Sequence, residues 1–346
     1  MQRQQYDIRL SASGSTLYPV LIGYGNLWCT EDMYLSIPPK FPYKGEWGTI
    51  QMNCELLQNS FCMPFFIEIL YLSVVEHKFY YLENELPYSM EKEYGNSFKS
   101  GQFTHVVIGM APYGGIAVWI RGSQKSILVS WMKGKEIDVD MAAFNPTNPE
   151  MSLKEYCDFY INNDEKIRKN LEHNGLPERN YFDKLMQQFC YRYLVLAERW
   201  DGERWLPLGE KDAVPEIDWV EEVLWDGTHD KLHDGSLMRY HAAGKPRKLA
   251  VKFHVGKDEY SAYFWMDEVR TREIFDRFYG AHRDTKCDFI IHIDPESRRY
   301  ELALFRYGLQ EPQVLPADAF EVLVFKNHFE HYRSDNYSQP RGAWIW

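Results

Sequence analysis

The run HVVIGMAPYGGIAVWI (residues 105–120) decides the fold class of this chain. Two apolar stretches flank the segment Ala111-Pro112-Tyr113-Gly114-Gly115. Proline fixes one backbone dihedral angle of a turn, and glycine accepts the positive φ values that tight turns require. Because β-branched residues dominate both stretches, the run predicts an antiparallel hairpin with strands over residues 105–110 and 116–120.

Strand patterns continue on both sides of this hairpin. Before it, residues 89–98 follow Pro87 and predict a helix that ends at Gly101. The alternation of apolar and polar residues predicts further strands over residues 6–11, 18–24, 65–81, 126–132 and 136–141. The N-terminal half is therefore expected to be mainly sheet.

Helices follow these strands. Ser152 and Glu155 have the spacing of a capping box, in which each side chain satisfies a free backbone donor, and they predict a helix over residues 153–173. A second helix is expected over residues 178–189. It leads into a strand over residues 192–200, which Asp201 and Gly202 turn back.

The last third returns to a sheet pattern. Residues 215–248 are polar and interrupted by glycine, so we expect irregular structure there. After them, residues 269–279 predict a helix, and residues 331–346 predict a loosely ordered tail. Strands are expected over residues 249–255, 260–266, 289–293, 300–306 and 320–325.

The two halves have the same order of predicted elements. A shift of 183 residues aligns residues 66–110 with residues 249–293 without a gap. We therefore predict an α+β protein of two tandem, duplicated units, residues 1–190 and 191–346, each an antiparallel sheet with an inserted helix. The alternative is two unrelated antiparallel sheets that each contain a helix.

Composition limits the partners and the compartment. The 346 residues fit two domains. A net charge of −11 disfavours nucleic acid and anionic membranes as partners. The sequence has no apolar run near the roughly 20 residues of a membrane span, and no signal-like core in its first ten residues. Six scattered cysteines without a C-x-x-C pair indicate reduced thiols and a cytoplasmic protein, although an exported form without its signal has the same pattern.

Three stretches of the first half carry a family resemblance. They are LYLSVVEHKFY (residues 70–80), THVVIGMAPYGGIAVWIRG (residues 104–122) and EIDVD (residues 136–140), followed by FDK at residues 182–184. Together they resemble the DUF2931 family over roughly residues 18–200. The family has no assigned activity, and some of its members resemble immunity proteins that neutralise secreted toxins.

One aromatic cluster stands out as a candidate binding surface. Its tryptophans are Trp200, Trp205, Trp219 and Trp225, and tryptophan is enriched at interface hot spots. Acidic residues follow them closely in the sequence and predict a solvated rim: Glu203, Glu210, Asp212, Glu216, Asp218, Glu221 and Glu222. The alternative is that the tryptophans pack in the core and the carboxylates are simply solvated.

The sequence gives little support for a catalytic or metal-binding site. His229 and His233 have the i, i+4 spacing of two helical metal ligands, but Asp226-Gly227 and Asp234-Gly235 predict a loop there, so we expect no metal. There is no G-x-S-x-G nucleophile motif and no phosphate-binding loop. We expect no cofactor and no catalytic residue.

These observations favour a non-enzymatic protein-binding module, with an immunity-type inhibitor of a basic toxin as its most concrete form. The partner is then another protein and neither a nucleic acid nor a membrane. The alternative is a carbohydrate-active enzyme, or a carbohydrate-binding protein, that uses tryptophans and carboxylates. The third hypothesis is a structural or envelope-associated module.

Overall fold

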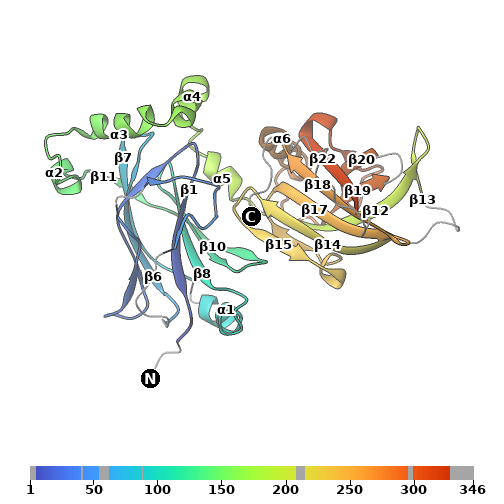
Figure 1. Cartoon of the computed structure of the whole chain (residues 1–346), viewed down its shortest axis with the longest axis horizontal. Helices are drawn as coiled ribbons and strands as arrows, with labels where there is room; N and C mark the ends of the chain where they lie inside the picture. The colour runs from blue at the N-terminus through green and yellow to red at the C-terminus, as the bar shows by residue number, and fades with distance from the viewer. Residues whose placement is uncertain are drawn as a thin grey trace.

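The computed structural model describes residues 5–39, 42–53, 62–87, 89–207, 215–294 and 299–327. Strands hold 46% of the residues and helices 19%, so the α+β class predicted from the sequence is confirmed, with sheet dominant. Two lobes lie side by side along the long axis of the molecule (Figure 1). No helix in the described ranges is long and apolar enough to cross a membrane.

The first lobe is built from two sheets. Their orders are β11-β7-β6-β2-β3, with β4 also on β2, and β10-β9-β8-β1-β5. The elements of this lobe, in chain order, are β1 (Arg9–Gly14), β2 (Val20–Trp28), β3 (Tyr34–Ser36), β4 (Pro42–Tyr43), β5 (Met52–Asn53), β6 (Phe66–Ser73), β7 (Lys78–Glu85), α1 (Ser89–Lys99), β8 (His105–Ala111), β9 (Gly115–Arg121), β10 (Ser126–Lys133), β11 (Lys135–Ile137), α2 (Met141–Phe144), α3 (Leu153–Asn162), α4 (Glu165–Asn174) and α5 (Tyr181–Leu185).

The core of this lobe contains residues from both sheets. Successive side chains of a strand point to opposite faces, so alternate residues of β6 enter the core. Ile67, Ile69 and Tyr71 are fully buried in it, together with Ile108 of β8 and Ile116 of β9. The predicted hairpin of residues 105–120 is confirmed, since β8 pairs antiparallel with β9.

The second lobe also contains two sheets. Their orders are β13-β12-β19-β20-β21, with β16 on β12, and β22-β18-β17-β14-β15. The elements are β12 (Phe189–Trp200), β13 (Trp205–Pro207), β14 (Pro215–Leu224), β15 (His229–Leu232), the 3₁₀ turn η1 (Asp234–Ser236), β16 (His241–Ala243), β17 (Pro246–Val255), β18 (Asp258–Met266), α6 (Glu268–Tyr279), β19 (Cys287–Asp294), β20 (Arg299–Phe305), β21 (Gln313–Val314), the 3₁₀ turn η2 (Ala317–Ala319) and β22 (Phe320–Asn327).

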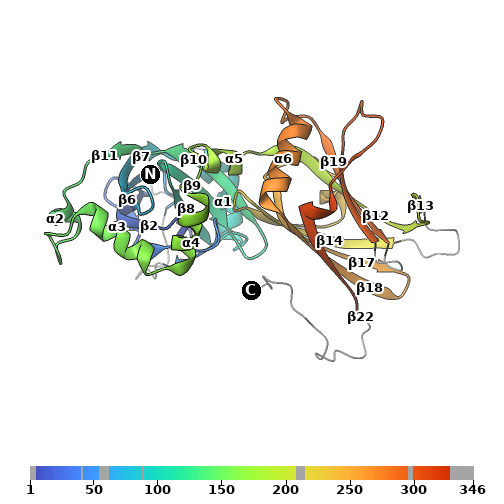
Figure 2. The ribbon, with the colours of Figure 1, turned by 90° about the horizontal axis from the view of Figure 1, so that it is seen from above.

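Each lobe contains a parallel strand pair. β1 runs parallel to β8, and β12 runs parallel to β19. The prediction of one antiparallel sheet per unit is therefore incomplete, because each lobe has two sheets. Along the chain, the second strand of each parallel pair follows a helix: α1 precedes β8, and α6 precedes β19. Figure 2 shows α3 and α4 on the first lobe and α6 against the sheets of the second.

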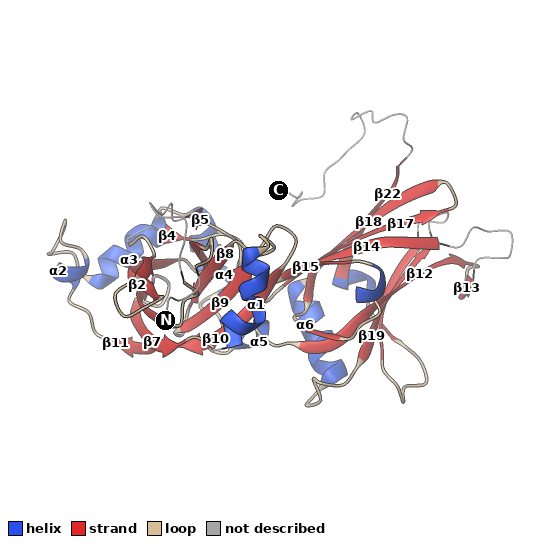
Figure 3. Cartoon of the chain, turned by 90° about the horizontal axis from the view of Figure 1, so that it is seen from below, coloured by secondary structure: helices blue, strands red, loops and turns tan. Residues whose placement is uncertain are grey.

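The lobes meet through one sheet edge. β10 pairs with β15 at a single position, Ser126 opposite His229, and this bridge makes one ten-stranded sheet that runs through both lobes (Figure 3). The Trp119 indole N–H donates to the carbonyl of Asp226 at 3.0 Å across the same junction. An apolar cluster that includes Trp47 and Phe182 packs beside it.

Three predicted elements differ from the structure. The single helix expected over residues 153–173 is two helices, because Asp164 caps α4 by accepting from the backbone N–H groups of Lys166 and Ile167. The helix expected over residues 178–189 ends at Leu185. The strand expected over residues 136–141 ends at Ile137, since Asp140 caps the short helix α2.

The irregular region expected over residues 215–248 is also a wrong prediction, because it contains β14, β15, β16 and the start of β17. The pairing of β14 with β17 shifts register between Ile217 and Trp219, and this irregularity breaks the alternation that would have indicated a strand. The predicted tail, residues 331–346, lies outside the described residues.

Candidate functional site

The four predicted tryptophans do not form one cluster. Trp200 and Trp205 face each other across the β12–β13 pair, with ring centroids 5.3 Å apart. Trp219 lies on β14, and Trp225 packs with the apolar cluster at the lobe junction. All four side chains are half-buried. Only Trp200 and Trp205 are therefore placed to act as one binding element.

The predicted acidic rim is divided as well. Glu222 is 2% exposed and points into the interior, so a solvated position is wrong for this residue. Glu221 points the other way and is half-buried, and burial raises the pKa of its carboxyl against the opposing attraction of Lys231. Of the remaining rim residues, Glu210 and Asp212 lie outside the described residues.

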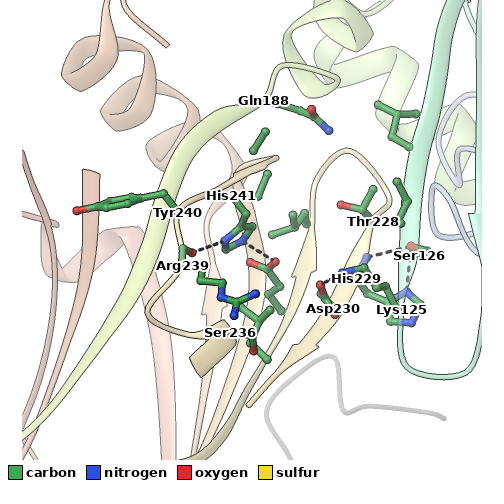
Figure 4. Close-up of a pocket in the computed structure, with 17 residues that line it drawn as sticks. Lys125, Ser126, Gln188, Thr228, His229, Asp230, Ser236, Arg239, Tyr240 and His241 are labelled. Carbon is green, nitrogen blue, oxygen red and sulfur yellow. Dashed lines mark hydrogen bonds and ion pairs between the residues drawn. The ribbon is translucent and has the colours of Figure 1, made fainter. Parts of the chain in front are cut away.

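Glu222 lines a cavity of about 400 Å³ between β10 of the first lobe and β14 to β16 of the second. Figure 4 shows its polar side chains converging from both lobes. The lining residues are Lys125, Ser126, Ile127, Leu128, Gln188, Glu222, Leu224, Thr228, His229, Asp230, Leu232, Ser236, Arg239, Tyr240, His241, Ala242 and Ala243. Sequence reasoning missed this site because its two walls are about a hundred residues apart in the chain.

Two tyrosines hold one oxygen of Glu222. The Tyr193 hydroxyl donates to Oε2 at 2.5 Å, and the Tyr191 hydroxyl lies 3.4 Å from the same oxygen. Tyr191 also donates to the carbonyl of Gly244 at 2.8 Å, which is its shorter bond. The second oxygen, Oε1, faces Nε2 of His241 at 3.4 Å. One oxygen is thus firmly bound and the other has only a long contact.

His241 forms an ion pair with this carboxylate. Burial alone would lower the pKa of the imidazole, but the hydrogen bond and the attraction of Glu222 outweigh it, so the pKa is raised from its usual value. Its Nδ1 lies 3.3 Å from the carbonyl of Arg239, another long contact. When it is protonated, the imidazole balances the charge of the buried carboxylate.

The opposite wall carries a second ion pair. Lys125 of the first lobe binds Asp230 of the second through a short contact. Beside it, the Ser126 hydroxyl oxygen accepts the backbone N–H of His229 at 3.0 Å and lies 3.0 Å from Nδ1 of the same residue. Burial lowers the pKa of His229 to about 4, so its imidazole is neutral at pH 7.

His229 and His233 do not share a helix face. The predicted loop is wrong at His229, which belongs to β15, whereas His233 follows the strand and lies 3.2 Å from the carbonyl of Asp218. Within the described ranges, no three His, Cys, Asp or Glu side chains are placed to hold one metal ion.

A second candidate site lies on the outer face of the first lobe. Trp28, Thr30, Glu31, Phe65, Phe66, Glu68 and Glu83 line a shallow hollow of about 370 Å³, which we name the acidic groove. Its residues come from β2, β6, β7 and the segments beside them. Tyr24 and Tyr34, among the most exposed large apolar side chains of the lobe, stand next to it.

Aromatic rings and carboxylates alternate along the acidic groove. The ring of Trp28 packs against that of Tyr34 at 4.8 Å between centroids. The Tyr81 hydroxyl donates to Glu83 at 2.9 Å and lies 3.3 Å from Glu68. Burial and these two carboxylates raise the pKa of Tyr81. Among the described residues, no cation is in an ion pair with Glu31, Glu68 or Glu83.

The described helices pack on only one half of the sheet face that carries the acidic groove. At the other end of the same face, Leu72 and Phe79 are buried beneath Phe144 of α2 and Cys157 of α3. A signal for this surface existed in the sequence, because Tyr24, Asn26 and Trp28 alternate with apolar residues along β2.

Comparison with known protein families decides the relationship of the chain. The family described as "Protein of unknown function (DUF2931)" matches residues 5–178, which is half of the sequence. The chain belongs to the DUF2931 family. The predicted resemblance is confirmed, with the match ending before α5. No curated protein and no solved structure matches the chain significantly.

The family match separates the two candidate sites. The acidic groove lies entirely within the DUF2931 unit, since its lining residues fall between Trp28 and Glu83. The cavity takes only its Lys125–Leu128 wall from that unit, and its remaining lining residues belong to the second lobe.

Proposed function

We propose that this DUF2931 protein binds another protein without turning over a substrate, and that the acidic groove is the contact surface. One observation carries the proposal: three carboxylates stand beside exposed aromatic rings, and no described cation pairs with them. The partner segment that fits carries lysine or arginine side chains.

Two interactions would hold such a segment. A cation above an aromatic face gains about 0.5–2 kcal/mol, depending on how far it is desolvated. Hydrogen bonds between a guanidinium or ammonium group and a carboxylate add about 1.5–3 kcal/mol each. Trp28 and Tyr34 supply faces, and Glu68 and Glu83 supply acceptors within one small area.

The charge of the whole chain supports the same partner. A net charge of −11 attracts a basic protein over distances of about the Debye length, roughly 8 Å at physiological salt. Such attraction raises the association rate more than it slows dissociation. We therefore expect binding that weakens as salt rises, mainly through the association rate.

An immunity-type inhibitor is the most concrete form of this function. A toxin that acts on nucleic acid or on an anionic membrane needs a basic surface, and an acidic protein that covers this surface would block it. The cytoplasmic location expected from the cysteines fits this role and stays a prediction. A carbohydrate-active enzyme remains the alternative function.

Trp200 and Trp205 form a second candidate surface. Arg299 stacks on the Trp200 ring at 3.5 Å, and His292 stacks on the Trp205 ring at 5.1 Å between centroids. Each ring therefore has one face occupied within the protein. The acidic groove is the stronger candidate because it adds three carboxylates that are in no ion pair with a described cation.

The experiment measures binding to the protein encoded beside the gene for this chain, with association rates at 50 and 300 mM NaCl. The test variant is the double substitution Glu68→Gln and Glu83→Gln. We expect slower association and a weaker dependence on salt for this variant. The control is Glu150→Gln with Glu311→Gln, which removes the same charge from two exposed positions elsewhere.

Two results would contradict the proposal. Equal association rates for the test and control variants would show that only net charge matters and that the acidic groove is not the contact. Loss of binding in Trp205→Ala alone would move the contact to the second lobe. Turnover of an oligosaccharide, abolished by one carboxylate substitution, would establish the enzyme instead.

We also infer that the second lobe is a structural copy of the first. The order β2-β6-β7-β11 corresponds to β14-β17-β18-β22, and the parallel pair β1·β8 corresponds to β12·β19. A shift of 183 residues moves β8 (105–111) onto residues 288–294, against Cys287–Asp294 for β19. An experimental structure in which residues 66–110 superpose elsewhere than on 249–293 would contradict this.

A further inference from the structure

We propose that the cavity at the lobe junction binds a small neutral molecule rich in hydroxyl groups, of the size of a monosaccharide or disaccharide. The volume of about 400 Å³ lies within the range of small-molecule sites, about 300–1,000 Å³. The site is independent of the acidic groove. Its chemistry is set by two ion pairs and an apolar wall, and the exposed Arg239 adds a further cation.

The charges of the cavity favour a neutral ligand. Glu222 is paired with His241, and Asp230 is paired with Lys125, so each carboxylate already has a basic partner. A ligand charge placed against these pairs would have to break one of them, and at Glu222, which is 2% exposed, this would leave a buried carboxylate without its partner. A neutral ligand leaves both pairs in place.

The contact between Glu222 and His241 selects for hydroxyl groups. Oε1 of Glu222 and Nε2 of His241 are 3.4 Å apart, and this buried nitrogen has no hydrogen bond of normal geometry. A hydroxyl group donates one hydrogen bond and accepts others, so it can donate to Oε1 and accept from Nε2 at the same time. Glu222 is itself 98% buried and held by Tyr193, so the acceptor is positioned before the ligand arrives.

The remaining lining residues also suit a sugar. Leu128, Leu224 and Leu232 present apolar surface that suits the C–H groups of a sugar ring. Ser236 and the amide of Gln188 offer further hydrogen-bonding groups around the same space (Figure 4). Polar groups that fix orientation on a mainly apolar lining are typical of small-molecule sites.

The test is a ligand-observed NMR titration of the full chain with D-glucose, N-acetylglucosamine and maltose, and with galacturonate as a charged comparator. We expect saturable binding of at least one neutral sugar and weaker binding of the anion. Glu222→Gln removes the negative acceptor, so affinity should fall about tenfold or more, as expected for one hydrogen bond to a charged group. Leu128 is half-buried, lines the cavity and belongs to neither ion pair, so the larger ring of Leu128→Trp should fill part of the space and also weaken binding.

The controls separate this site from the acidic groove. Glu68→Gln lies in the other lobe and should leave sugar affinity unchanged, whether or not the acidic groove binds a protein. If Glu222→Gln fails to fold, the Leu128→Trp result decides. The proposal is wrong if no neutral sugar binds the wild-type protein, or if binding survives unchanged in Leu128→Trp.

Discussion

Gly48 of the first lobe and Gly227 of the second approach each other so closely that a Cβ atom on Gly48 would lie 2.5 Å from the Cα atom of Gly227. Both glycines have positive φ values, 78° and 86°. Gly227 belongs to the turn between β14 and β15, whose Asp226 carbonyl accepts from the Trp119 indole. The backbones of the two lobes are therefore in direct contact at this position.

Gly48→Ala should therefore destabilise the protein strongly. A matched control exists in Gly101, whose φ of 76° is nearly the same but which has no atom within 4 Å of an added Cβ. Gly101→Ala measures the backbone cost alone, about 1–2 kcal/mol. We expect Gly48→Ala to cost at least about 2 kcal/mol more in urea unfolding. Equal losses for the two variants would mean that the junction is not tightly packed.

The stability of the junction should depend on the protonation of Asp226. Burial raises the pKa of this carboxyl from 3.8 to about 6 against the hydrogen bonds from Thr228. Between pH 4 and 6 the folded protein holds a proton that the unfolded chain has lost, so stability falls as pH rises through this window.

Asp226→Asn removes this titration. From pH 4 to pH 7 the wild type should lose up to about 3 kcal/mol of stability that the variant keeps, because one pKa unit corresponds to about 1.4 kcal/mol. Urea unfolding at both pH values measures the difference. A constant gap between wild type and variant across this range would show that the pKa of Asp226 is not raised.

His229 should act in the opposite direction. Burial lowers the pKa of its imidazole from 6.5 to about 4. Between these values the unfolded chain holds the proton and the folded protein does not, so acidification destabilises the wild type. His229→Gln should abolish up to about 3 kcal/mol of this loss between pH 7 and pH 4. Identical pH profiles of wild type and variant in urea unfolding would contradict a buried, neutral His229.

Local sequence signals predicted much of the fold. The capping box of Ser152 and Glu155 is confirmed, with both reciprocal hydrogen bonds present, because its chemistry needs only residues three apart. The turn at Gly202 between Trp200 and Trp205 is confirmed for the same reason. Glu76 lies in the turn between β6 and β7 and accepts from the Tyr80 hydroxyl four residues further along the chain, which is another local contact.

The cavity could not be predicted from such signals. Ser126 and His229 are 103 positions apart and meet only because the edges of two sheets pair at one position. The sequence predicts a solvated Glu222, since carboxylates are rarely buried without partners. Its partners Tyr191 and Tyr193 lie on another sheet, and nothing in the neighbouring sequence indicates them.

The two tyrosines at Glu222 should differ in what their hydroxyl groups contribute. Tyr193 donates to the carboxylate at 2.5 Å, whereas the shorter bond of Tyr191 goes to the neutral carbonyl of Gly244. Hydrogen bonds to charged groups contribute about 1.5–3 kcal/mol to stability and neutral ones about 0.5–1.5 kcal/mol. Phenylalanine keeps the ring of either residue, so Tyr193→Phe should cost about 2–3 kcal/mol in urea unfolding and Tyr191→Phe about 1 kcal/mol. If Tyr191→Phe proves the more damaging, the carboxylate depends on Tyr191 rather than on Tyr193.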